Sequence, residues 1–71
     1  MCLAVPSLVL SRKEYSAEVE MMGNKMTVGI MLTPEVEVGQ YVLIHAGQAI
    51  RIIDLEAAEE SLAEWEKLLH G

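Results

Sequence analysis

The stretch AEVEMMGNKMTVGIML at residues 17–32 decides the fold class of this chain. Apolar residues recur at every second position on both sides of its centre: Ala17, Val19 and Met21 first, then Met26, Val28, Ile30 and Leu32. This period is typical of strands with one buried and one solvated face. The pair Gly23-Asn24 lies between the two runs, and both residues tolerate the positive φ of a two-residue turn. The stretch therefore predicts a β-hairpin.

Further short strands are predicted on both sides of the hairpin. They are the apolar runs Leu3 to Leu10, Tyr41 to Ile44 and Ala49 to Ile53. Pro6 donates no ladder hydrogen bond, so it indicates an edge or a bend in the first run. Thr33 to Gly39 is predicted to be a loop, Tyr41 to Ile44 a strand buried on both faces, and Gly47 a break between the last two runs. Five short strands in about fifty residues favour a small closed or nearly closed barrel, because closure removes exposed strand edges.

From Asp54 onward the hydrophobic period changes to that of an α-helix. Asp54 is suited to the N-cap position, because its side chain accepts hydrogen bonds from the first free backbone N–H groups. The apolar residues form one stripe at spacings of three and four: Leu55, Ala58, Leu62, Trp65 and Leu69. We expect the helix to dock through Trp65. The sequence thus predicts one domain over residues 1–71, with a barrel at 1–53 and a C-terminal α-helix at 54–71 packed on or beside it.

The charge balance is acidic, with 5 Lys and Arg against 11 Asp and Glu and a net charge of −6. Such a surface repels phosphate backbones and anionic lipids, so we expect neither nucleic acid nor a membrane as a partner. The helical segment holds six of the eleven acids and one of the five bases. We interpret this as a solvated outer face, the alternative being an acidic face that meets a basic partner.

Cysteine and methionine usage limits the chemistry further. A single cysteine excludes an internal disulfide and a zinc site built from several cysteines. No apolar run approaches the roughly 18 residues of a membrane span, and no signal peptide opens the chain, so we expect a cytoplasmic protein. Because Phe is absent, the five methionines are interpreted as aliphatic core filler rather than as a copper site.

Cys2 is the first residue whose side chain suggests chemistry. Removal of Met1 leaves an N-terminal cysteine, whose ammonium group favours the thiolate by Coulomb attraction. Thiolate and amine together form a five-membered chelate for a soft or borderline metal. The alternative is a small apolar residue that opens a buried strand.

His45 follows the predicted strand Tyr41 to Ile44 and immediately precedes Ala46 and Gly47. A histidine in this position can face a surface site, where its imidazole binds a metal or accepts a proton. The alternative is a core or rim histidine with satisfied hydrogen bonds. Cys2 and His45 alone leave a metal under-coordinated, which is typical of a carrier that shares its metal with a partner.

Two other function classes remain open on the residues alone. One is a hydrolase with Cys2 as an N-terminal nucleophile, although no oxyanion hole is evident and the chain is short for enclosing a substrate. The other is a binding module for single-stranded nucleic acid, which uses basic grooves and stacked aromatic residues. The chain has only three aromatic residues, which are Tyr15, Tyr41 and Trp65, and its net charge is −6. Both features disfavour this class.

The segments MCLAVPSLV at residues 1–9 and GQYVLIHAGQAI at 39–50 resemble the HypC/HybG/HupF family of NiFe-hydrogenase maturation chaperones. The intervening GNKMTVGIML at 23–32 and the acidic C-terminal helix also fit, so the resemblance covers essentially the whole chain. The combination of MC-x-x-x-P with VxxHxGxA about forty residues later is specific, whereas either half alone is weak.

The resemblance implies a small OB-like β-barrel of about five strands with a C-terminal helix, in a protein that is not an enzyme. It implies binding to a HypD-type scaffold protein, on which an iron unit with cyanide and carbon monoxide ligands is assembled. It also implies transfer of this transiently held unit to the hydrogenase large-subunit precursor. Cys2 maps onto the family's iron and partner contact, His45 onto a second iron contact, and Pro6 and Gly47 onto supporting motif positions. We expect transient heterodimers and no tight homo-oligomer.

Two positions depart from the family pattern. Gln48 stands where an aromatic residue is common, and Ser7 stands where glycine commonly follows the motif proline. Neither departure removes a candidate ligand, so both bear on partner identity more than on the general function.

Overall fold

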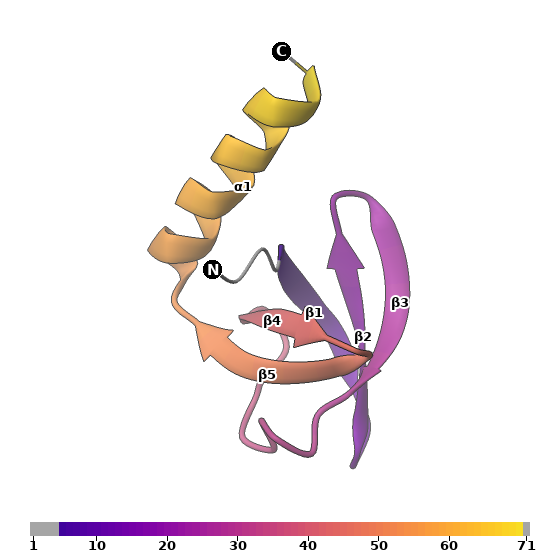
Figure 1. The fold of residues 1–71 in the computed structure, drawn as a ribbon. Coiled ribbons are helices and arrows are strands. Elements are labelled where there is room, and N and C mark those ends of the chain that lie inside the picture. The colour runs from indigo at the N-terminus through magenta and orange to yellow at the C-terminus, as the bar shows by residue number, and fades with distance from the viewer. Residues whose placement is uncertain (1–4, 71) are drawn as a thin grey trace.

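The protein folds as a β-barrel with a C-terminal helix (Figure 1). The structure is a computed structural model that describes residues 5–70, and at positions 55, 57 and 70 it describes the backbone alone. Its elements are β1 (Pro6–Arg12), β2 (Ser16–Met21), β3 (Asn24–Gly29), β4 (Tyr41–His45), β5 (Gln48–Ile53) and α1 (Leu55–His70). The strands close into a barrel in the order β1-β2-β3-β5-β4. The predicted small OB-like barrel with a C-terminal helix is confirmed.

The barrel closes along two seams of different kinds. At one, β1 pairs with β4 in antiparallel register, with Pro6 opposite Leu43. At the other, β3 and β5 run parallel and share a single bridge between Gly29 and Gln48. The Gln48 side chain lies directly over Gly29, where a Cβ atom would overlap its amide group. A larger residue at position 29 would therefore require the Gln48 side chain to move.

The β2–β3 hairpin is present, but its turn lies one residue earlier than predicted. The turn residues are Met22 and Gly23, with φ of 49° and 90°, and Met21 pairs with Asn24. A turn at Gly23 and Asn24 would shift the register by two residues and keep the same side chains inside, so hydrophobic alternation did not separate the alternatives. The observed turn places glycine at the second central position, where the positive φ is largest.

The barrel interior is aliphatic, as expected without phenylalanine. Its buried residues are Val9, Ala17, Val19, Val28, Ile30, Val36, Val42 and Ala49. The predicted return strand ends early, at Gly29: Ile30 is still buried, but Met31 and Leu32 are 70% and 66% exposed. The chain turns here, because the Thr33 N–H donates to the Ile30 carbonyl over 3.1 Å. The interpretation of Met31 as core filler is therefore wrong, whereas Met26 does pack against the core.

The predicted loop between the third and fourth strands is confirmed, and it covers one end of the barrel. Arg12 holds it in place by donating from Nη1 to the carbonyls of Pro34 and Val36, over 2.8 and 2.6 Å. Val36 is fully buried below this contact. The following strand is less covered than predicted: Val42 is buried, but Tyr41, Leu43 and Ile44 are only partly so. The helix covers one part of the wall and leaves the rest to solvent (Figure 1).

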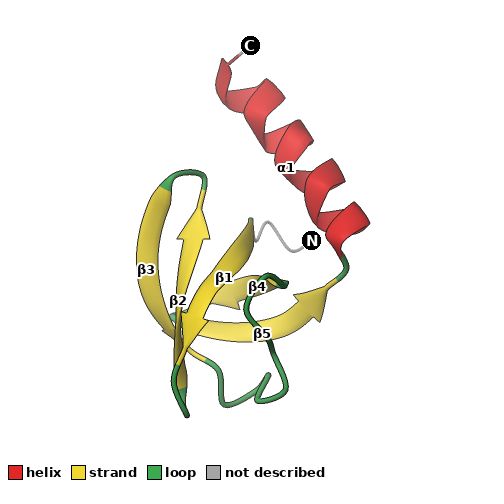
Figure 2. Ribbon diagram, turned by 180° about the vertical axis from the view of Figure 1, so that it is seen from behind, coloured by secondary structure: helices red, strands yellow, loops and turns green. Residues whose placement is uncertain are grey.

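α1 begins after Asp54, whose carbonyl accepts a hydrogen bond from the Ala58 N–H over 3.0 Å, as expected of an N-cap residue. Ala58 is buried, and Leu62 and Trp65 are partly buried. Leu69, predicted to continue the docked stripe, is 59% exposed. The reason is geometric: 16 residues of helix span about 24 Å, and the last turns extend past the barrel (Figure 2).

Candidate functional site

His45 lies at the end of β4, and its side chain is exposed. The next two residues reverse the chain: Ala46 and Gly47 have φ of 52° and 78°, and His45 pairs with Gln48 across the turn. The Gly47 carbonyl accepts a hydrogen bond from the Gly29 N–H over 2.9 Å, which anchors the turn to β3. The imidazole has no hydrogen bond or ion pair in the described part of the chain. The alternative of a core histidine is therefore wrong, and the side chain is available to an external group.

Pro6 is buried at the start of β1 and pairs with Leu43, midway along β4. As the first residue of its strand it leaves the ladder intact. Leu43 and His45 share the outer face of the barrel, because Val42 and Ile44 contact the core. His45 is two positions after Leu43 along the strand, a distance of about 7 Å. The structure thus brings Pro6 to the strand that presents His45.

Cys2 lies outside the described residues, so its approach to His45 stays a prediction. Within residues 5–70, no cluster of three or more His, Cys, Asp or Glu side chains forms a metal site. The same residues include no helix long and apolar enough to cross a membrane.

The two positions that depart from the family pattern have different surroundings. Ser7 is fully buried, and its hydroxyl donates to the Val5 carbonyl over 3.4 Å. Gln48 is exposed and folds back over Gly29 at the barrel seam. Gln48 is therefore adjacent to the His45 turn, whereas Ser7 is buried in β1 immediately after Pro6.

A groove that the sequence did not predict lies on the outside of the barrel, next to Pro6. It has a volume of about 340 Å³, and its lining includes Pro6, Leu8, Glu20, Tyr41, Leu62 and Glu66. These residues come from β1, β2, β4 and α1, so no local sequence pattern groups them. Tyr41 and His45 occupy opposite ends of β4, about 13 Å apart along the strand. The groove and the exposed imidazole are therefore neighbouring but separate features of one wall.

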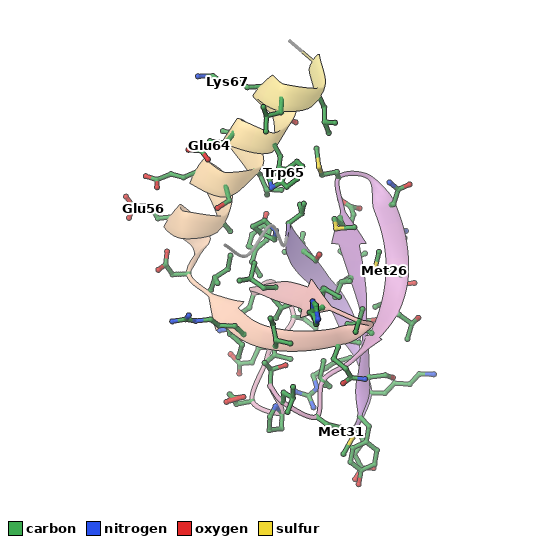
Figure 3. The ribbon with its side chains drawn as sticks, viewed as in Figure 1. Met26, Met31, Glu56, Glu64, Trp65 and Lys67 are labelled. Carbon is green, nitrogen blue, oxygen red and sulfur yellow. The ribbon has the colours of Figure 1, made fainter. Side chains whose placement is uncertain are left out.

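The helix presents different side chains to the groove and to solvent. In Figure 3, Trp65 projects from the side of α1 that faces the hairpin, whereas Glu56, Glu64 and Lys67 project away from the barrel. The acidic residues of the helical segment are all exposed, as expected of a solvated face, and Glu66 is the one among them that also lines the groove.

Together these features define a small barrel protein that presents a histidine and a groove on the outer surface of its wall. Residues 1–65 match the model of the HupF/HypC family. The chain is 41% identical over 70 residues to the hydrogenase maturation factor HypC of Synechocystis sp., covering 90% of this chain and 92% of that one. It is 41% identical over 69 residues to the hydrogenase maturation factor HybG of Escherichia coli, covering 87% and 84%. HypC of Cupriavidus necator is 40% identical over 63 residues, covering 87% and 70%. The chain therefore belongs to the HupF/HypC family.

Proposed function

We propose that this protein is a hydrogenase maturation chaperone. In this role it binds a HypD-type scaffold protein, receives an iron unit with cyanide and carbon monoxide ligands, and transfers it to the hydrogenase large-subunit precursor. Membership of a family whose relatives are named hydrogenase maturation factors supports the general role. The observation that carries the finer proposal is the exposed His45, held at a tight turn with no partner among the described residues.

Cys2 and His45 are the residues we propose as iron contacts. A thiolate and a neutral imidazole both suit iron, and two protein ligands leave the remaining positions to the diatomic ligands and to the partner. Cys2 is four positions before Pro6, a span of at most about 14 Å for a fully extended chain. Because Pro6 pairs with the strand that ends at His45, this span permits both donors to reach one iron unit. Incomplete ligation favours release, which a carrier requires.

The test is a pull-down from anaerobic cell extract with the tagged full chain, Cys2→Ala and His45→Ala. The captured proteins are identified by mass spectrometry, and infrared spectra report cyanide and carbonyl stretches. We expect wild type to capture the scaffold or the precursor together with infrared bands of cyanide and carbon monoxide. Cys2→Ala is expected to capture neither protein. His45→Ala is expected to capture the partner protein with weaker bands.

His70→Ala is the matched control, since His70 is the second of the two histidines in the sequence. It is expected to behave as wild type. Equal capture and equal bands in all four proteins would refute the assignment of Cys2 and His45.

A further inference from the structure

We propose that the groove beside Pro6 receives a basic side chain, arginine or lysine, from an apolar segment of a partner protein. This inference rests on the proposed function, in which a protein partner docks on this chain, and it adds the chemistry that the partner must present. The occupant follows from the size of the groove, from the apolar side chains in its lining and from its two carboxylates.

Part of the groove lining is apolar, and the size of the groove is limited. Leu8 on β1 and Leu62 on α1 line it and are only partly buried, and the buried Pro6 lines it as well. A volume of about 340 Å³ is at the low end of binding cavities, which range from about 300 to 1,000 Å³. It therefore suits one or two side chains rather than a folded element. Long basic side chains lay their alkyl stems along such surfaces and keep the charged group at the rim.

Two carboxylates line the groove, Glu20 from β2 and Glu66 from α1, and no basic residue lines it. Neither carboxylate has an ion pair in the described part of the chain. Lys25 is opposite Glu20 in the hairpin register but does not line the groove, and Lys67 projects away from it (Figure 3). Within residues 5–70, the two groove carboxylates are thus not neutralised by an ion pair. A cation with an apolar stem complements both parts of this mixed lining, the apolar side chains and the two carboxylates.

A partner of different composition fits this groove better than a second copy of the chain. The chain carries 11 acids and 5 bases, so two copies repel one another. One of those bases, Arg12, is already engaged with the carbonyls of Pro34 and Val36.

A direct binding measurement tests the groove without any natural partner. The probes are the capped tripeptides acetyl-Leu-Arg-Leu-amide and acetyl-Leu-Gln-Leu-amide, titrated into the ¹⁵N-labelled full chain. We expect the arginine peptide to shift the amide signals of Leu8, Gly23 and Leu62 saturably. The glutamine peptide is expected to bind about tenfold more weakly, the effect of losing a charge-assisted hydrogen bond. Equal binding of both peptides, no binding, or shifts confined to other residues would overturn the proposal.

A pair of charge-matched variants tests the groove in the complex. Glu20→Gln with Glu66→Gln removes the two groove carboxylates, whereas Glu56→Gln with Glu64→Gln removes two that project away from the barrel. Both variants are first checked for an unchanged melting temperature. Affinity for the purified scaffold protein and for the precursor is then measured as a function of salt. We expect the groove variant to bind about tenfold more weakly with a smaller salt dependence, and the control to stay within about twofold.

The outcomes separate this inference from the proposed function. Equal loss in both variants, or no loss in either, would overturn the groove proposal while leaving the chaperone role intact. If wild type bound neither protein, the chaperone role would fail, and the peptide titration would still decide the groove. Self-association of wild type that the groove variant abolishes would identify a second copy as the occupant and also overturn the proposal.

Discussion

Gly29 and Gln48 are paired across the parallel seam between β3 and β5. The parallel seam has only one bridge, and it lies where the Gln48 side chain covers Gly29. Gln48 is also one of the two positions that depart from the family pattern. Its side chain is therefore part of the wall next to the His45 turn.

The overlap at this seam predicts that the effect of Gly29→Ala on stability depends on the residue at position 48. Gly29→Ala places a Cβ atom against the Gln48 amide, so the side chain must move, and we expect a loss of about 1 kcal/mol in the free energy of unfolding. In a Gln48→Ala background the overlap is gone, and the same change is expected to be neutral or to stabilise by about 0.5–1 kcal/mol, since alanine loses less backbone entropy. Urea denaturation of the four chains measures this cycle. If the effects of Gly29→Ala and Gln48→Ala on the unfolding free energy were additive, the contact between the two residues would be refuted.

Among the elements, the β2–β3 hairpin is the clearest case where the sequence predicted the type of element but not its register. Two turns were compatible with the same alternation of apolar residues, and the backbone adopts the one that gives Gly23 a φ of 90°. The first turn residue is Met22, with a φ of 49°, in a region that side chains other than those of Gly, Asn and Asp rarely adopt. The hairpin therefore includes a locally unfavourable residue at its tip.

Met22→Asn is expected to relieve this conformation. Asparagine tolerates positive φ, and Asn-Gly is the preferred pair for such turns, so we expect a gain of about 0.5–1 kcal/mol in unfolding free energy. Gly23→Ala, which forces a side chain into a φ of 90°, is the opposing control and should destabilise. Both are measured by urea denaturation. Met22 also lines the groove, so destabilisation by Met22→Asn would mean that this contact outweighs the backbone gain.

In the whole molecule, a compact barrel carries a helix that projects beyond it. The Cα extents of 39 × 21 × 20 Å reflect this shape (Figure 2). The first turns of α1 are held on the barrel at Ala58 and Leu62, whereas Leu68 and Leu69 in the last turn are 77% and 59% exposed. The stability of the molecule should therefore depend on the first half of the helix and not on its end.

Leucine substitutions at two points of α1 test this division. Leu62→Ala removes partly buried apolar surface and is expected to cost about 1–2 kcal/mol in unfolding free energy. Leu69→Ala removes exposed surface and should stay within about 0.5 kcal/mol of wild type. Thermal denaturation of both variants, with circular dichroism to follow helix content, gives the comparison. Similar losses would show that the last turn is also docked.

The sequence by itself determined the class of each element, because hydrophobic period and turn residues act over short stretches. The alternation around Val19 and Val28, the loop at Pro34 and the N-cap at Asp54 are all local signals, and all three are confirmed. The sequence also identified His45 and Pro6 as candidates, through a spaced motif and a resemblance.

Only the tertiary structure decided what depends on packing between distant segments. The hairpin register, the exposure of Leu69 and the contact of Gln48 with Gly29 are set by how elements meet, which no local period encodes. The groove is the fullest example, because its lining joins Leu8, near the start of the chain, to Glu66, near its end. Glu66 is a solvated acid by its position in the sequence, and it becomes a groove residue because closure of the barrel places β1 beside the helix.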